Sequence, residues 1–527
     1  MSAEAETRAE VRAARSHTLR VHVDADPGRL NPLVSPTTWG RRITLGTVFE
    51  PLLRYVPPDR PGEAGRFAPR LARAWRVAPN GLEILVEIEP NVTFHDGRRL
   101  TTSDVQFTLD AVRDPRRGID HVRHMLDDIE AVELVTDVEV RLRLRRPSGW
   151  VLRALAEIPI LPMHVYDGSL LAGGAIVGSG PWRLASNKNG TVHLTRHEKY
   201  WGGPPAIADL EFVYQPDAAV VLKDAKRGDY DIVPALIPAH YPDQANAPGI
   251  SASFDKLELR PLRMRYFAFN SKRAPLDDVR IRHAVALLVN RREVAKSMSQ
   301  LARPVLWPIW PGGFVAAPEA SVPDFDPKKA GALLDDAGWS DTDKPPDGYR
   351  DRPDPKGKRP NPRLTLVLVG LERPAKTPAE AKSDVAGGAP HTAREMFVEA
   401  AKRVGIVIEV RTGSEAWLAK RLEDGNYDIV ELAWNGMVDA DIGTRLFGKN
   451  SRRAGSPRID RALDAMAAAW DPAERTKLAP ELAAAFEETW PFAGIVVDAP
   501  QGLVHKRVKG VRTWDGWIDF TQLSFAN

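Results

Sequence analysis

A short pattern that occurs once in each half of the chain constrains the fold more than any other feature of the sequence. Gly228 to Val233 read GDYDIV, Gly425 to Val430 read GNYDIV, and each copy follows a stretch with helical spacing. Glycine commonly ends a helix, and the apolar residues after it are typical of a strand. The pattern predicts the same helix–turn–strand device in two related α/β lobes, although six residues can also match by chance.

The length of the chain also requires more than one folding unit. A single hydrophobic core stops growing at roughly 250–300 residues, and this chain has 527 residues. Hydrophobic residues make up 43% of the chain and charged residues 27%, as in an ordinary soluble globular protein. We therefore expect at least two lobes.

The charge balance and the cysteine content exclude several classes of function. The 73 basic and 70 acidic residues leave a formal net charge of +3, which gives no electrostatic footprint for nucleic acid. Because the chain has no cysteine, disulfides, cysteine-ligated metals and thiol catalysis are excluded. No arrangement of nucleophile and base is recognisable, so we expect no enzyme, no cofactor and no metal site.

The start of the chain bears on its location. Residues 1–16 are polar and alanine-rich, and we expect them to form a disordered tail. They lack the apolar region of a signal peptide, and no apolar run in the chain reaches the roughly 18–20 residues that span a bilayer. Either an export signal is absent from this chain, or the protein stays inside the cell.

Strand and helix patterns alternate along the chain, as an α/β fold requires. Residues 18–23 alternate between apolar and polar side chains and predict a strand, whereas the continuous apolar run 364–369 predicts a strand buried on both faces. Val279 to Met298 show one long helical pattern, and Asp326 to Ala337 predict a second helix that ends at Gly338.

Several sequence blocks occur in an order typical of one family. Pro69 to Trp75, Asn80 to Leu82 and Val92 to Gly97 are followed by Leu100-Thr101 and Asp104-Val105; then come Gly178 to Trp182, Tyr200 to Gly203, Phe269-Asn270 with Pro275 to Arg282, and Asp326 to Trp339. Together they resemble the family 5 extracellular solute-binding proteins, which include the oligopeptide-, dipeptide- and nickel-binding receptors. The resemblance covers the chain from about Leu19 to Leu523.

The resemblance implies an α/β, two-lobed periplasmic binding protein fold (type II, cluster C-like) with an extra inserted subdomain. Lobe I would combine residues 17–50, 160–262 and 490–527, and the inserted subdomain would comprise residues 51–159. Lobe II would comprise residues 263–489, with crossings near 262 and 490 as the hinge. Closure of the lobes on a ligand would be driven by a higher affinity of the ligand for the closed state.

The resemblance also points to a ligand site after the strand that ends near Ala433. In peptide-binding members the tryptophan that corresponds to Trp434 packs on the ligand, and an aspartate three residues later pairs with the α-amine of the peptide. Here Met437 occupies that position, with Asn435 and Gly436 between. Either Asp439 pairs with the amine, or the ligand is a modified peptide, an opine-like compound or a sugar without that amine.

Other side chains are candidates for the walls of the same cleft. Glu431 stands where some oligopeptide receptors have an arginine for a ligand carboxylate, and Trp417 lies on the helix before this strand. Trp39 and Arg41 follow the first strand and are candidates to face the cleft from lobe I, and Tyr266 lies near the hinge. For each of these three, an ordinary surface or packing role is the favoured interpretation.

The resemblance implies a function in transport. We expect an extracytoplasmic substrate-binding protein that captures a peptide or a peptide-like small polar solute and delivers it to an ABC transporter permease. We expect a monomer that is periplasmic or anchored outside the cytoplasmic membrane, attached only through a lipid anchor lost with the export signal. A ligand sensor of the same fold, signalling through a membrane partner, is the alternative.

Overall fold

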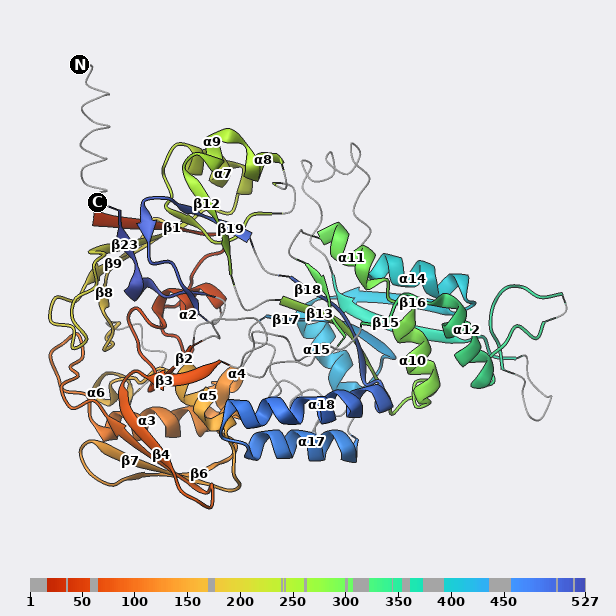
Figure 1. Cartoon of the computed structure of the whole chain (residues 1–527), viewed down its shortest axis with the longest axis horizontal. Helices are drawn as coiled ribbons and strands as arrows, with labels where there is room; N and C mark the ends of the chain where they lie inside the picture. Colours follow the sequence, from red (N-terminus) through yellow and green to blue (C-terminus); the bar gives the residue numbers. More distant parts are fainter. Residues whose placement is uncertain are drawn as a thin grey trace.

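Two β-sheets, each at the centre of one lobe, organise the computed structural model (Figure 1). The structure describes residues 17–34, 37–56, 65–168, 176–237, 240, 243–259, 263–298, 302–306, 322–343, 345–352, 361–372, 393–435, 456–498, 501–514 and 517–526. The predicted tail, residues 1–16, lies outside this part of the chain.

Lobe I is built on a seven-stranded sheet with the strand order β12-β19-β11-β1-β10-β9-β8. Its strands are β1 (Thr18–Val23), β8 (Trp182–Lys188), β9 (Thr191–Arg196), β10 (Asp209–Tyr214), β11 (Ile232–Val233), β12 (Phe254–Glu258) and β19 (Gln501–His505). Helices α2 (Thr38–Thr44), α7 (Ala218–Lys226), α8 (Asp243–Asn246) and α9 (Pro248–Ser251) accompany it, with the short strands β20 (Val508–Lys509), β21 (Thr513–Trp514), β22 (Trp517–Ile518) and β23 (Ser524–Phe525).

Lobe II is built on a six-stranded sheet with the order β14-β18-β13-β17-β15-β16. Its strands are β13 (Arg263–Phe269), β14 (Arg303–Pro304), β15 (Thr365–Leu371), β16 (Val407–Gly413), β17 (Ile429–Asn435) and β18 (Phe492–Asp498). Its helices are α10 (Val279–Leu287), α11 (Arg291–Met298), α12 (Pro327–Asp336), α14 (Ala393–Arg403), α15 (Glu415–Asp424), α17 (Pro457–Ala468) and α18 (Pro472–Thr489).

The two lobes share a core of five strands in the same order and directions. The run β12-β19-β11-β1-β10 corresponds to β18-β13-β17-β15-β16. In each run the last three strands are parallel to one another, and the two strands before them are each antiparallel to their neighbours. The relationship predicted from the GDYDIV and GNYDIV patterns is therefore present in the fold.

The aspartate that follows the tyrosine in each repeated pattern makes the same contact. The carboxylate of Asp231 accepts the backbone N–H of Arg20 on the neighbouring parallel strand (3.0 Å), and that of Asp428 accepts the N–H of Val367 (2.7 Å). An arginine from the adjacent antiparallel segment pairs with each carboxylate: Arg507 at 2.6 Å and Arg273 at 3.1 Å. The repeated residues thus tie the start of the strand to its neighbour in both lobes.

The inserted subdomain is a four-stranded antiparallel sheet, β4-β5-β7-β6, covered by helices. The strands of this sheet are β4 (Ala72–Val77), β5 (Glu83–Ile88), β6 (Ile129–Leu134) and β7 (Glu139–Leu144), and β2 (Leu53–Val56) and β3 (Arg66–Pro69) form a separate two-stranded sheet. Its helices are α3 (Thr102–Arg113), α4 (Asp120–Arg123) and α5 (Trp150–Glu157), and α6 (Met163–Tyr166) follows.

The expectation of one long helix over Val279 to Met298 is wrong. The chain forms α10 and α11, separated at residues 288–290. The Arg291 side chain, only 2% exposed, donates to the carbonyls of Ala286 (3.0 Å) and Val289 (3.3 Å) at the end of α10. A cation at a helix C-terminus stabilises the free carbonyls, so this buried arginine favours the break.

Candidate functional site

The carboxyl ends of the parallel strands of both sheets face the points where the chain passes between the lobes. In lobe II, Asn435 at the end of β17 pairs with Arg263, the first residue of β13 after the chain leaves lobe I. In lobe I, Val233 at the end of β11 pairs with Leu503, near the start of β19 after the chain returns. Ligands of open α/β sheets bind at such carboxyl ends, so a ligand held between the lobes would contact both.

The lobe II wall carries an ion pair between Arg394 and Glu431. Arg394 lies in the first turn of α14, and its Nε donates to Glu431 Oε2 on β17 at 2.6 Å. Both side chains are 12% exposed. Gly370 on β15 makes room for the guanidinium, because a Cβ there would lie 2.5 Å from Arg394 Nη2. Glu431 is therefore charge-compensated within its own lobe.

Trp417 lies in the first turn of α15, at the same end of the lobe II sheet but on the opposite face from Arg394. Its ring packs over Gly413, where a Cβ would lie 2.6 Å from the indole, and the Arg421 guanidinium lies 5.3 Å from the ring centroid. The side chain is half-buried. The indole of Trp417 therefore packs on the last residue of β16, at the end of the sheet that faces the cleft.

The lobe I wall begins where β1 ends. Trp39 on α2 is buried and donates from Nε1 to Asp24 Oδ1 (2.5 Å), and it meets Trp517 edge to face at 5.2 Å. Arg41 pairs with Glu157 at the end of α5 (3.0 Å). Although burial opposes ionisation of Glu157, the guanidiniums of Arg153 and Arg41 lower the pKa of its carboxyl.

The remaining predicted site residues fall into three sets. Tyr266 on β13 is 2% exposed and packs edge to face on Phe492, so it belongs to the core of lobe II. Trp434 and Asn435 form the last two residues of β17, at the lobe I end of the strand. Gly436, Met437 and Asp439 lie outside the described residues.

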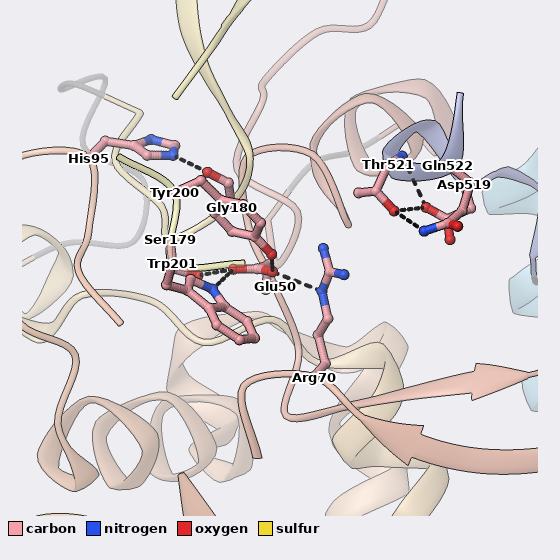
Figure 2. A network of polar contacts seen from close by, with 10 residues as sticks. All are labelled: Glu50, Arg70, His95, Ser179, Gly180, Tyr200, Trp201, Asp519, Thr521 and Gln522. Atoms are coloured by element: carbon pink, nitrogen blue, oxygen red, sulfur yellow. Dashed lines mark hydrogen bonds and ion pairs between the residues drawn. The ribbon is translucent and has the colours of Figure 1, made fainter. Parts of the chain in front are cut away.

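The blocks that carry the family resemblance converge on one buried carboxylate, Glu50 (Figure 2). This fully buried group accepts Ser179 Oγ (3.0 Å), Tyr200 Oη (2.6 Å) and Trp201 Nε1 (3.2 Å), and pairs with Arg70 Nε at 2.8 Å. Burial and the Glu50 carboxylate raise the pKa of the Tyr200 phenol. These motif residues hold lobe I to its inserted subdomain and lie apart from the cleft walls described above.

His95 of the same motif set carries a half-buried imidazole. Its Nε2 lies 2.9 Å from the Gly180 carbonyl, and its Nδ1 accepts the Gly178 N–H at 3.3 Å. Burial lowers the pKa of His95 to about 4. Alanine is excluded at Gly178, because a Cβ would lie 1.9 Å from the Val48 carbonyl oxygen.

Other motif residues cap helices. Asp104 and Thr101 form a capping box on α3, and Asp326 accepts the Lys329 N–H (2.8 Å) at the start of α12. The Arg282 guanidinium donates from Nε to the Thr489 (2.9 Å) and Trp490 (3.1 Å) carbonyls at the end of α18. Their role is structural, so the family motifs identify the fold rather than the ligand.

Three carboxylates, those of Asp341, Asp343 and Asp351, place oxygen atoms within 4.8 Å of one another, far from the cleft-facing ends of the strands. No helix in the described ranges combines the length and apolarity needed to cross a bilayer.

The family model of the bacterial extracellular solute-binding proteins, family 5, matches residues 66–454. The chain belongs to this family, and it is a substrate-binding protein of an ABC importer. The family consists of extracytoplasmic solute receptors that work with ABC transporter permeases.

Relatives and solved structures agree with this assignment. The chain is 25% identical to the di/tripeptide-binding protein 2 of Pseudomonas aeruginosa, over 95% of this chain and 93% of the relative. The fold matches the oligopeptide-binding protein AppA of Bacillus subtilis in complex with a nonapeptide (TM-score 0.70, 19% identity, 97% and 99% of the two chains). It also matches AgaA of A. tumefaciens R10 in complex with agropinic acid (TM-score 0.72, 22% identity, 97% and 99%).

Proposed function

We propose that the protein captures a short peptide or a peptide-like small polar solute between its lobes and presents the closed complex to the permease. One observation carries the proposal: the carboxyl ends of β17 and β11, in two similarly ordered sheets, both lie next to the crossings between the lobes, with β17 leading toward Trp434 and β1 leading toward Trp39. The relative from P. aeruginosa, named for di- and tripeptides, supports the peptide class.

A single chain provides both walls, so the protein acts as a monomer. Its place of action is outside the cytoplasm, as for other members of the family, where a lipid anchor would keep it near the permease. Catalysis is not part of this proposal.

The ligand class can be tested by thermal unfolding against a panel of ligands. The panel comprises unmodified di- to pentapeptides, the same peptides with a blocked amine, opine-type amino-acid conjugates and sugars. A ligand that binds only the folded state at a hundredfold excess over its Kd stabilises it by about 2.7 kcal/mol. Stabilisation by peptides supports the proposal, whereas stabilisation by sugars alone contradicts it.

The role of Asp439 follows from the same panel. If Asp439 pairs with a ligand amine, Asp439→Asn loses the preference for free-amine peptides over blocked ones. The matched control is Asp336→Asn on the outer helix α12, which should leave that preference unchanged. An equal loss for free and blocked peptides would show that Asp439 does not bind the amine.

A further inference from the structure

We propose that the Arg394–Glu431 pair makes the lobe II wall electrically neutral, so that it selects an uncharged dipolar part of the ligand, such as an amide, over a free carboxylate or ammonium. This inference rests on the proposed function and specifies the chemistry of the same cleft. The two residues would both determine specificity: Arg394 cancels the negative charge of Glu431, and Glu431 cancels the positive charge of Arg394.

The position of Arg394 favours a role beyond helix stability. An arginine in the first turn of a helix faces the positive end of the helix dipole, which disfavours a cation there. Arg394 nevertheless occupies this turn of α14, where Glu431 compensates its charge across 37 residues of sequence. Gly370 provides the space that lets the guanidinium lie over the strand.

The pair keeps hydrogen-bonding capacity. The guanidinium engages Glu431 through Nε and Nη2, and Nη2 also lies 3.4 Å from the Leu371 carbonyl. Arginine has five N–H donors, and a carboxylate has two oxygens with about four acceptor sites. Among the described residues, no contact engages Nη1 of Arg394 or Oε1 of Glu431, so the pair offers N–H donors and an acceptor oxygen that match the C=O and the N–H of an amide.

Electrostatics decides between ligand charges at this wall. A free carboxylate beside Arg394 also meets Glu431, and the three groups together carry an uncompensated negative charge in a cleft that loses water on closure. Burying an unpaired charge is costly, whereas a hydrogen-bonded neutral group adds no net charge. Because both side chains are 12% exposed, salt screens the pair only weakly.

Two single substitutions should shift the preference in opposite directions. Glu431→Gln leaves Arg394 uncompensated, and the affinity ratio of a tripeptide acid to its C-terminal amide should rise about tenfold relative to the wild type, which is about 1.4 kcal/mol. Arg394→Gln leaves Glu431 uncompensated and should raise the ratio of the free-amine peptide to its N-acetyl form. The double variant is neutral again and should return both ratios to near the wild-type values.

The measurement is isothermal titration of trialanine, trialanine amide and N-acetyl-trialanine into the four proteins, with melting temperatures of the ligand-free proteins as folding controls. If wild type binds and all variants keep its ratios, the pair has only a structural role and this inference is overturned while the proposed function stands. If wild type binds none of the three peptides, both the peptide proposal and this inference fail. If a single variant does not fold, the other single variant and the double variant still decide the question.

Discussion

At the residue scale, Glu50 shows why the family blocks recur together. Four donors from three separated segments meet one fully buried carboxylate: Arg70, Ser179, Tyr200 and Trp201. A buried charge is stable only when it is paired and hydrogen-bonded, so each donor depends on the others. Although burial opposes the charge of Arg70, the carboxylates of Glu50 and Asp519 and the Tyr200 phenol raise the pKa of its guanidinium.

Glu50→Gln should destabilise the protein by about 3–5 kcal/mol, because it leaves the Arg70 charge without its buried partner. The measurement is the free energy of unfolding in urea. Glu87→Gln is the matched control: Glu87 pairs with Arg73 at the surface, where an ion pair contributes about 0–1 kcal/mol. Equal losses in the two variants would contradict the role assigned to Glu50.

The half-buried imidazole of His95 should make stability depend on pH. Its pKa of about 4 in the folded state lies below the ordinary histidine value of 6.5, so the unfolded chain binds the proton more tightly. The stability that the neutral ring contributes is fully present above pH 6.5 and is lost as the pH falls toward 4, by about 3 kcal/mol in total.

His95→Gln should therefore flatten the decline in unfolding free energy between pH 6.5 and pH 4. Part of the decline remains, because burial also lowers the pKa of His197 and of His22. The comparison is between the slopes of the two proteins rather than their absolute stabilities. An unchanged slope would show that His95 does not contribute to the pH dependence of the unfolding free energy.

At the element scale, the hairpin of α17 and α18 docks on the inserted subdomain, as Figure 1 shows beneath the two lobes. The Gly149 N–H donates to the Ala467 carbonyl (2.7 Å), and Arg146 bridges Asp128 and Asp464, each at 2.7 Å. The fully buried Arg475 of α18 lies 4.5 Å from the Trp150 ring centroid. The hairpin thus contacts lobe I as well as α10 of lobe II.

Gly149→Ala should weaken this docking. A Cβ at Gly149 would lie 1.9 Å from Arg475 Nη2 and 2.8 Å from the Ala469 carbonyl oxygen, so either the hairpin or the subdomain must shift. Overpacking of this kind costs about 1–3 kcal/mol, measured by urea unfolding. Gly249→Ala, where nothing lies within 4 Å of the added Cβ, is the control and should change stability by less than about 0.5 kcal/mol.

At the scale of the whole molecule, the chain passes between the two sheets twice, from β12 to β13 and from β18 to β19, and the α17–α18 hairpin adds a contact between the lobes. Few covalent connections between two rigid lobes permit hinge closure around a ligand. The ligand can shift that equilibrium only through a higher affinity for the closed state.

Closure predicts that a bound ligand reduces the radius of gyration in small-angle X-ray scattering. A compact chain of 527 residues has a radius of gyration of about 24 Å by the scaling for single domains. The ligand-free protein should exceed this value and approach it when ligand saturates the cleft. A ligand that raises the melting temperature without changing the radius of gyration would contradict closure.

The sequence was informative where local chemistry decides the structure. Glycine followed by an apolar strand predicted the device shared by the lobes, and Asp326 to Gly338 predicted α12 with its caps. The break between α10 and α11 was missed, because it depends on Arg291, whose Nε also donates to Gly494 on a strand distant in sequence. The lobe boundaries given above stay predictions.

The cleft was harder to predict than the fold. Glu431 was recognised as a candidate, but its partner Arg394 was not, since the two are 37 residues apart and meet only across α14 and β17. An arginine in a first helical turn was the available indication. Asp24 beside Trp39 and Glu157 beside Arg41 were missed for the same reason, because each pair joins different elements.

The sequence by itself determined the family, the α/β pattern and the internal relationship of the lobes, because caps, turns and apolar periodicity depend on neighbouring residues. The tertiary structure alone decided that Arg70, Ser179, Tyr200 and Trp201 of the family motifs meet at Glu50, and that Glu431 is paired with Arg394. Both facts depend on which side chains from distant segments become buried together, and the free energy of a charge depends on that burial.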